Sequence, residues 1–325
     1  MFSYIVRRLC YAIPILIGVN IITFALFFMV NSPDDIARMH LGNKHVSQAA
    51  IINWKNQHGY DKPLFYNAHE QGWHRLSQTL FIKKSLDLFL FNFGHSDQGR
   101  SIGQDIKERM IPSLALAIPV LIIGLGINIS LSLLLALFRG SSIDTIGVGI
   151  CVVMMSISGL FYVIIGQYII GKLWQLVPIS GYGNGFSAIK FLILPVLIGV
   201  IGGIGSSVRW YRTIFLEQLH KDYVRTARAK GLSQWRVLSR HVLRAGLIPI
   251  LTGVVVIIPS LFMGSLIMES FFGIPGLGSY TIDAIHQQDF NVVRVMVFLG
   301  TVLYIIGLIL TDISYTWADP RVEFN

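Results

Sequence analysis

Gly166, Gly171 and Lys172 have the spacing of a phosphate-binding loop, in which backbone amides and a lysine hold the phosphates of a nucleotide. The place of the Mg²⁺-binding Ser or Thr is taken by Leu173, and no soluble strand precedes this apolar run. The match is therefore false. No other stretch has a pattern for binding ATP, so any energy from ATP must reach this chain through another one.

Histidines are concentrated between residues 31 and 110, which hold six of the nine: His40, His45, His58, His69, His74 and His95. The pairs His40/His45 and His69/His74 have a gap that half a zinc finger would accept. The cysteines that such a finger also needs are missing from this segment. We therefore expect surface histidines, with no metal and no cofactor bound by this chain.

The usual signatures of catalysis are also missing. The sequence has no His-Glu-x-x-His helix, no nucleophile elbow and no carboxylate pair within an apolar run that would favour hydrolysis or proton coupling. Cys10 and Cys151 both lie in apolar runs, where small buried hydrophobes are the simplest interpretation. We expect that this chain is not an enzyme.

Composition points to a membrane protein. Of the 325 residues, 53% are apolar before the 31 glycines are added, and only 13% are charged. Soluble domains are about 25% charged, so a soluble fold could not cover such a core. The composition excludes a cytosolic enzyme, a disulfide-stapled secreted module and a disordered scaffold. It predicts an all-α, polytopic membrane fold.

Six apolar stretches are long enough to cross about 30 Å of hydrocarbon as helices. They are Leu9 to Val30, Pro112 to Phe138, Ile146 to Ile170, Phe191 to Val208, Leu247 to Met268 and Val292 to Leu310. Five prolines interrupt them: Pro14, Pro119, Pro195, Pro249 and Pro259. Neighbouring helices can satisfy the carbonyls that proline frees, so we expect kinks and no breaks at these positions.

The distribution of Lys and Arg sets the orientation. An even number of spans puts both termini on one side, and the segments on that side hold 13 Lys and Arg. The two short loops opposite hold only Lys172 and Lys190. Both termini are therefore expected in the cytoplasm, and the net charge of +9 mostly reflects orientation, with little reason to invoke nucleic acid. We interpret Arg7 and Arg8 as flanking an uncleaved first helix, the alternative being a signal peptide.

The spans divide the chain into four parts. Residues 1–31 hold the cytoplasmic N-terminus and first span, and residues 32–110 form an extracytoplasmic segment expected to pack as a small helical cap. Residues 111–312 form a core of five spans, and residues 313–325 form a cytoplasmic tail. Within the core, the loop 209–245 is too long for a turn and too patterned for a linker.

That loop carries two amphipathic patterns. The first stripe is Leu216, Leu219, Tyr223 and Ala227, and the second is Trp235, Leu238 and Val242. Gly231 between them can adopt the left-handed conformation that ends a helix, and Ser233 is a suitable N-cap. A basic amphipathic pair lying on anionic lipid is the alternative. A membrane-surface helix gains nothing from a central break, so the turn favours a docking element for a cytoplasmic partner.

The residues of this loop resemble a known family. The run Asp222-Tyr-Val-Arg-Thr-Ala-Arg-Ala-Lys-Gly-Leu232, followed by Arg240-His-Val-Leu-Arg244, is similar to the EAA-type loop of ABC importer permeases of the oligopeptide/dipeptide branch, B-type subunit. Three more segments agree: Tyr4 to Leu9, the Gly-Ile-Pro-Gly-Leu-Gly run from Gly273, and the tail around Asp312 to Tyr315 and Asp319 to Val322. The resemblance covers nearly the whole chain.

The resemblance implies a permease that imports di- or oligopeptides across a bacterial inner membrane. It implies four partners: a second homologous permease, two cytoplasmic ATPases that hold ATP and Mg²⁺, and an extracytoplasmic binding protein. The ATPase-coupling residues it implies are Tyr223, Arg225, Ala227, Arg228, Gly231, Leu232 and Trp235. Arg225 stands where the motif's namesake Glu would be, so the resemblance implies no acidic contact there.

Two questions stay open at this stage. Glu269, Ser265 and Gln167 are candidates for the translocation path or an outer gate, the alternatives being a locally paired helix-end acid and ordinary hydrogen bonds between helices. The cargo is the other question, since relatives that carry nickel complexes, glutathione or antimicrobial peptides look similar. A secondary transporter is a further alternative, although it would predict inverted repeats and ionisable groups at mid-membrane.

Overall fold

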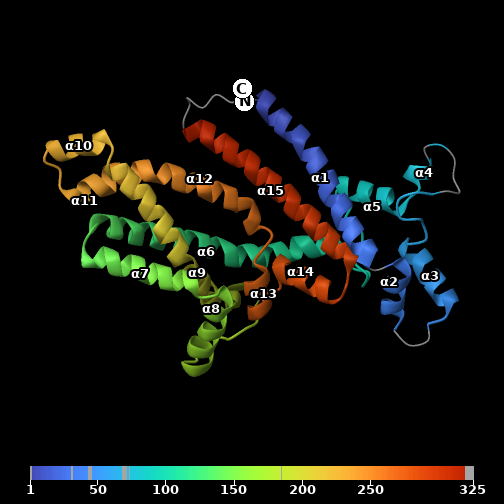
Figure 1. Ribbon diagram of the computed structural model, residues 1–325. Helices are drawn as coiled ribbons and strands as arrows, with labels where there is room; N and C mark the ends of the chain where they lie inside the picture. The colour runs from blue at the N-terminus through green and yellow to red at the C-terminus, as the bar shows by residue number, and fades with distance from the viewer. Residues whose placement is uncertain are drawn as a thin grey trace. The chain divides into compact units, whose positions relative to one another are not determined.

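The computed structural model describes residues 2–30, 32–42, 46–67, 72, 74–183 and 185–318. Within these residues the chain is helical and has no strand beyond one isolated bridge, His95 to Ser101 (Figure 1). The expected all-α class is confirmed.

The helices of the first half are α1 (Phe2–Val30), α2 (Pro33–Leu41), α3 (Gln48–His58), α4 (His74–Ser77), α5 (Leu80–Phe89), α6 (Ile102–Leu137), α7 (Ser142–Ser156) and α8 (Gly159–Gly166). Two short helices follow, the π-helix η1 (Gln167–Leu173) and the 3-10 helix η2 (Gly185–Ser187). The second half contains α9 (Ala188–Leu219), α10 (Asp222–Ala229), α11 (Gln234–Val237), the π-helix η3 (Leu238–Val242), α12 (Leu243–Leu261), α13 (Leu266–Phe272), α14 (Leu277–His286) and α15 (Phe290–Ala318).

Five helical segments are long and apolar enough to cross a membrane. The expected third span is different, because α7 and the α8–η1 segment meet at an angle of 91° and do not form one straight helix. Ile157 and Ser158 both have extended backbone angles, with ψ of 127° and 142°, and two such residues end one helix and begin another. The chain has six spans only if this bent pair crosses as one.

The prolines do not break their helices, as the sequence predicts. Pro14, Pro119, Pro195, Pro249 and Pro259 all lie inside helices, and none of them ends one. The expected tail from residue 313 is helical at its start, since α15 continues to Ala318. Residues 319–325 lie outside the described part of the chain, and so do His45 and His69 of the two histidine pairs.

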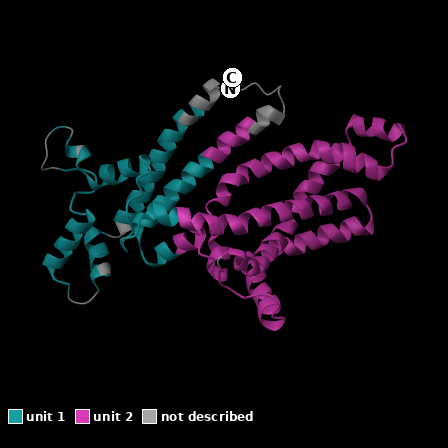
Figure 2. Cartoon of the chain, turned by 180° about the vertical axis from the view of Figure 1, so that it is seen from behind, with its two compact units in different colours: residues 1–106, 283–305 teal, residues 107–282, 306–325 magenta. Residues whose placement is uncertain are grey.

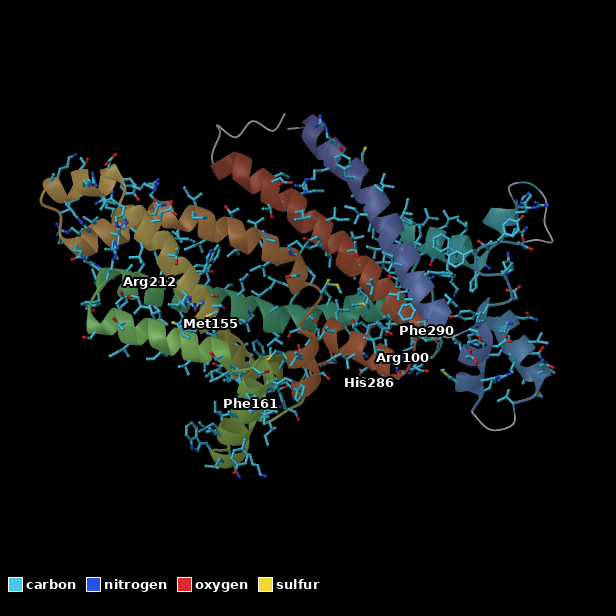
Figure 3. All side chains as sticks on the ribbon, viewed as in Figure 1. Arg100, Met155, Phe161, Arg212, His286 and Phe290 are labelled. Atoms are coloured by element: carbon cyan, nitrogen blue, oxygen red, sulfur yellow. The ribbon has the colours of Figure 1, made fainter. Side chains whose placement is uncertain are left out.

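The chain divides into two compact units (Figure 2). One holds residues 1–106 and 283–305, and the other holds residues 107–282 and 306–325. In the first unit, helices α2, α3 and α5 share a core with the end of α1, formed by Phe24, Phe28, Ile36, Ala37, Ile51, Trp54, Tyr60 and Leu80. Phe290 at the start of α15, labelled in Figure 3, adds to it. The centroid of its ring lies 4.9 Å from that of Phe27. The small helices between residues 33 and 89 therefore pack on the end of α1, whereas residues 102–110 of the expected segment begin the long helix α6.

The second unit is a bundle of long helices. Leu135 of α6, Cys151 of α7 and Val208 of α9 form one buried contact between three of them. Gly205 allows α9 to lie against α7, because a Cβ there would be 2.7 Å from the Cys151 carbonyl oxygen. Many apolar side chains of this unit remain exposed, for example Ile146, Val153 and Ile193, as expected of surfaces that face lipid or another membrane chain.

Candidate functional site

The loop 209–245 consists of the end of α9, the short helix α10, a turn at Gly231, and the continuous run of α11, η3 and the start of α12. The first predicted helix is thus two helices. His220 and Lys221 separate Leu219 from Asp222, and the extended Lys221 (ψ 151°) begins α10. Asp222 then lies in the first turn of α10, where its charge is favourable to the helix dipole.

The turn at Gly231 forms as the sequence predicts. Gly231 has φ of +77°, in the left-handed region that glycine adopts without cost. Its N–H donates to the Arg228 carbonyl at 2.9 Å, and the Leu232 N–H donates to the Ala227 carbonyl at 3.4 Å, so the last carbonyls of α10 are satisfied. Ser233 is extended and precedes α11, but its side chain makes no capping hydrogen bond.

The buried face of the loop differs from the predicted stripes. Val224 and Ala227 of α10 are buried, whereas Tyr223 is 38% exposed. In the second stripe Val237 is buried where Trp235 was expected, and Trp235 is 58% exposed. The buried residues share a cluster with α6, α9 and α12, which consists of Leu133, Ala136, Tyr211, Phe215, Val224, Ala227, Val237, Leu238, Val242 and Ile250. The loop is therefore packed firmly on the bundle.

Two further contacts seat the loop. Gly246 at the start of α12 lies against Phe215 of α9, and a Cβ on it would be 2.5 Å from the ring. The side-chain amide of Gln234 donates to the Leu137 carbonyl at 3.3 Å, which joins α11 to the end of α6. A movement of α10 and α11 must therefore carry the ends of α6, α9 and α12 with it, because closely packed interiors transmit displacement.

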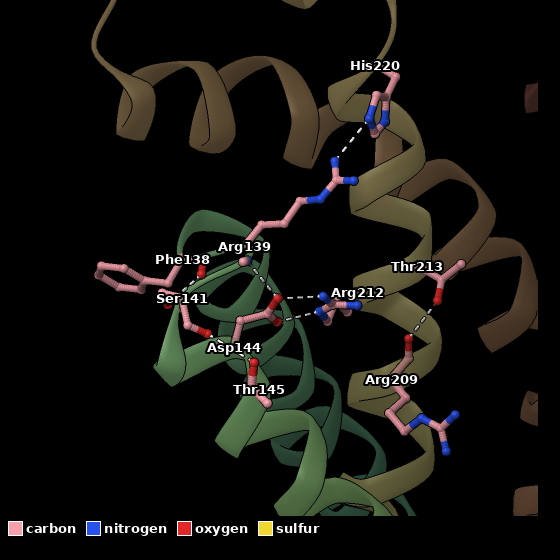
Figure 4. Close-up of polar contacts among 10 residues, drawn as sticks. Phe138, Arg139, Ser141, Asp144, Thr145, Arg209, Arg212, Thr213 and His220 are labelled. Carbon is pink, nitrogen blue, oxygen red and sulfur yellow. Dashed lines mark hydrogen bonds and ion pairs between the residues drawn. The ribbon is translucent and has the colours of Figure 1, made fainter.

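A buried ion pair braces the part of α9 that belongs to this loop. The guanidinium of Arg212 binds both carboxylate oxygens of Asp144 in α7, and the Gly140 N–H donates to the same carboxylate at 3.1 Å (Figure 4). About two helical turns further along, at the end of α9, Arg139 Nη1 lies 3.0 Å from His220 Nε2. Sequence reasoning missed the pair. The available signals were Asp144, a lone acid in the turn between two apolar runs, and Arg212, an arginine near the end of α9.

The outward surface of the loop is basic. Arg225 and Arg228 of α10 are exposed. Between α10 and the α11–η3 run lies a groove of about 680 Å³, here called the basic groove, whose lining includes Lys230, Arg236, Arg240 and His241. None of the described residues that line it is acidic. Of the seven predicted coupling residues, Tyr223, Ala227 and Leu232 line this groove, whereas Arg225, Arg228, Gly231 and Trp235 do not.

Glu269 of α13 lies in a second, fully buried site. Its carboxylate accepts hydrogen bonds from Ser113 Oγ at 2.8 Å, the Ser265 N–H at 3.1 Å and the Ser279 N–H at 3.0 Å. Ser113 Oγ in turn accepts from the Leu277 N–H at 2.8 Å. Burial raises the pKa of Glu269 above the ordinary range, against the opposing effect of these donors.

The other two predicted path residues lie around the same helix. Ser265 caps α13 by accepting from the Met268 N–H at 3.4 Å. Gln167 donates from its side-chain amide to the Phe271 carbonyl at 3.0 Å and to the Ile179 carbonyl at 3.3 Å. The structure thus brings Glu269, Ser265 and Gln167 together at α13, where they hold this helix in place. Ser113, which is 156 residues before Glu269, was not predicted.

Polar groups that could hold a metal ion do not converge in the described part of this chain. Within its described residues, no three of His, Cys, Asp and Glu come together as a metal site. His58 makes structural contacts within α3. Its Nδ1 lies 2.9 Å from the Trp54 carbonyl oxygen, and its ring stacks on that of Trp54 with the two centroids 4.2 Å apart.

The long apolar helices and the basic loop define the class of protein, a multi-pass helical membrane protein. Residues 128–324 match the family model described as the inner membrane component of binding-protein-dependent transport systems, and residues 1–91 match the model of the N-terminal part of such components. The chain belongs to this family, the membrane permeases of ABC importers, and is a component of the inner membrane.

Several curated relatives are similar along the whole chain. A putative peptide transport system permease protein of Brucella abortus is 31% identical over 336 residues, with 100% of each chain covered. An oligopeptide transport system permease protein of Bacillus subtilis is 30% identical over 332 residues, again with 100% coverage of both. The dipeptide transport system permease protein of Escherichia coli K12 is 28% identical over 356 residues, with 99% of each covered.

Proposed function

We propose that this chain is the permease subunit of an ABC importer that moves di- or oligopeptides across the inner membrane. The names of relatives that align over the full length support peptide cargo. The proposed partners are a second homologous permease, two cytoplasmic ATPases and an extracytoplasmic substrate-binding protein. ATP and Mg²⁺ bind to the ATPases, and this chain performs no catalysis of its own.

Both termini and the loop 209–245 face the cytoplasm in this proposal. The excess of Lys and Arg on that side supports the orientation. The loop is then the contact with the ATPases, through Tyr223, Arg225, Ala227, Arg228, Gly231, Leu232 and Trp235. Residues 32–110 face the other side, where the binding protein delivers its cargo.

The mechanism is a two-state switch. When ATP draws the ATPases together, they displace the loop, and the bundle exchanges an inward-facing for an outward-facing packing. ATP can bias this equilibrium only through contacts that differ between the two states. The loop can transmit the bias because its buried residues pack on α6, α9 and α12. The packing of the loop 209–245 on α6, α9 and α12 is the single observation on which the mechanism rests.

Reconstitution tests the function directly. The chain, its partner permease and the ATPases are placed in vesicles, and uptake of a labelled peptide is measured with and without ATP and binding protein. We expect uptake that requires all components. ATP-independent uptake by this chain alone would indicate a secondary transporter and overturn the proposal.

The cargo requires a separate measurement. Glu269, Ser265 and Gln167 are occupied in holding α13, so they support a role at an outer gate better than direct contact with cargo. Mass spectrometry of the cognate binding protein, purified with its natural ligand, should reveal a di- or oligopeptide. A nickel complex, glutathione or an antimicrobial peptide in its place would keep the importer and change its substrate.

A further inference from the structure

The basic groove presents cations without counter-ions. Lys230 comes from the end of α10, Arg236 from α11, and Arg240 and His241 from η3. Within the described chain, none of Lys230, Arg236 and Arg240 forms an ion pair with a carboxylate. The two nearby acids pair with other cations. Asp222 Oδ1 lies 3.6 Å from Arg225 Nη1, and Glu217 Oε1 lies 3.7 Å from Lys221 Nζ. The positive charges of the groove are therefore available to pair with an anionic partner.

The hydroxyl groups of the groove narrow the chemistry of that partner. Tyr223 donates its proton to Gln218 at 3.0 Å, Thr226 to the Asp222 carbonyl at 3.1 Å, and Ser239 to the Trp235 carbonyl at 2.9 Å. Their oxygens keep lone pairs that can accept hydrogen bonds. The groove thus combines cationic donors with neutral acceptors. A polypeptide that carries carboxylates also has backbone N–H groups for these acceptors, so an acidic segment of polypeptide can satisfy both parts of the lining.

We propose that the basic groove receives an acidic segment of the partner ATPase. The inference rests on the proposed function and specifies its contact: the ATPase supplies Asp or Glu side chains to Lys230, Arg236 and Arg240. In this contact the permease supplies the positive charges and the ATPase supplies the negative ones. Arg225, which stands where the motif has an acid, is also positively charged. The floor of Ala227 and Leu232 gives the segment an apolar base.

Carbodiimide crosslinking tests the contact, because this reagent joins an amine to a carboxylate only where the two already touch. The full complex of permeases and ATPases is assembled in nanodiscs of phosphatidylcholine, which carries no net charge. We expect Lys230 to be joined to an Asp or Glu of the ATPase, and Arg236→Lys and Arg240→Lys to add crosslinks to the same segment. Lys221 serves as the internal control, since it should join Glu217 of its own chain.

Binding measurements provide a second test. Loss of two solvent-accessible ion pairs in R236Q/R240Q should weaken ATPase association by about 5- to 30-fold and flatten its dependence on salt. Arg244→Gln removes an exposed cation one helical turn further along, outside the groove, and should stay within about twofold of the native chain.

The outcomes separate the two claims. If ATPases bind, but the groove residues crosslink only within the permease and R236Q/R240Q binds like the native chain, the acidic-segment proposal is wrong and the proposed function stands. If the double variant differs from the native chain only when anionic lipid is present, the groove is a lipid site and the proposal is wrong. If the native chain binds no ATPase at all, both fail.

Discussion

Arg212 of α9 holds the carboxylate of Asp144 in α7 with two parallel hydrogen bonds, Nε to Oδ1 at 2.8 Å and Nη2 to Oδ2 at 2.7 Å. The Asp144 side chain is only 7% exposed and that of Arg212 only 20%. A bidentate pair of this kind fixes both distance and orientation. It therefore holds α9 against α7 within the α9 part of the loop 209–245.

Breaking this pair should destabilise the protein. Arg212→Met leaves a buried carboxylate with the Gly140 amide as its remaining bond, and we expect a loss of about 2–4 kcal/mol in the free energy of unfolding. The double variant D144L/R212M should lose less than R212M alone, because no charge is then left unpaired. Denaturant titration in detergent measures both. Glu217→Gln, which removes an exposed pair, is the control and should change stability by less than about 0.5 kcal/mol.

Substitutions at Gly231 should separate backbone strain from crowding. A Cβ at this position would meet nothing within 4 Å, so the penalty of a side chain comes from the positive φ alone. Gly231→Asn should retain ATP-driven uptake, because Asn tolerates the left-handed region. Gly231→Leu and Gly231→Val should lose about 1–2 kcal/mol in the stability of the turn, because their side chains are strained at positive φ, and should uncouple ATP hydrolysis from transport. Uptake at the normal rate by both of the latter variants in reconstituted vesicles would show that the turn is not required.

Gly276→Ala should disrupt the Glu269 site. A Cβ on Gly276 would clash with the Glu269 carboxylate and would be 2.5 Å from Ser113 Oγ. We expect a loss of about 1–3 kcal/mol from overpacking, together with reduced transport if α13 belongs to an outer gate. Thermal unfolding and peptide uptake measure the two effects. Gly203→Ala is the matched control, since a Cβ there meets nothing within 4 Å.

Lys84 should titrate at unusually low pH. Burial, followed by the charge of Arg294, lowers its pKa to about 8, although its ammonium donates to Asn291 Oδ1 at 3.2 Å and lies 4.9 Å from the centre of the Tyr60 ring. Between pH 8 and the ordinary lysine range, the folded chain then binds fewer protons than the unfolded chain, so this group makes stability rise with pH. NMR of ¹³C-methylated lysines should show a midpoint near 8.

The signal from Lys84 can be assigned by its loss in Lys84→Arg. The comparison is the unperturbed lysine value of about 10.4. A midpoint for Lys84 at that value would contradict the burial of its ammonium group.

Local and compositional features of this chain could be predicted from its sequence. Apolar runs of about 20 residues predict spanning helices, since a helix satisfies its own backbone in lipid and the strands of a barrel, the other spanning structure, need only about 9–11 residues. The left-handed turn at Gly231 was also predictable, because glycine is the residue that adopts it freely. The break at Ile157 and Ser158 was missed because the run was interpreted as one apolar span, although Ser156, Ser158 and Gly159 lie within it and a Ser-Gly pair is a turn signal.

The side-chain partnerships were out of reach for a related reason. The bonds from Arg212 to Asp144 and from Ser113 to Glu269 join residues 68 and 156 positions apart. Periodicity reports only which face of a helix is apolar, and it cannot choose between neighbouring residues when both are apolar. Val224 and Val237 are buried where the stripes placed Tyr223 and Trp235.

The most direct test of the account asks on which side of the membrane the loop lies and what covers it. A cysteine at position 229, which is exposed on α10, is introduced after Cys10→Ser and Cys151→Ala have removed the native thiols. Lys83→Cys in the 32–110 segment is the control. We predict that a membrane-impermeant maleimide labels position 83 in intact cells, but labels position 229 only in inverted vesicles stripped of the ATPases, which protect it when bound. Labelling of position 229 in intact cells, or no protection by the ATPases, would contradict the assignment of this loop as the contact through which ATP hydrolysis drives transport.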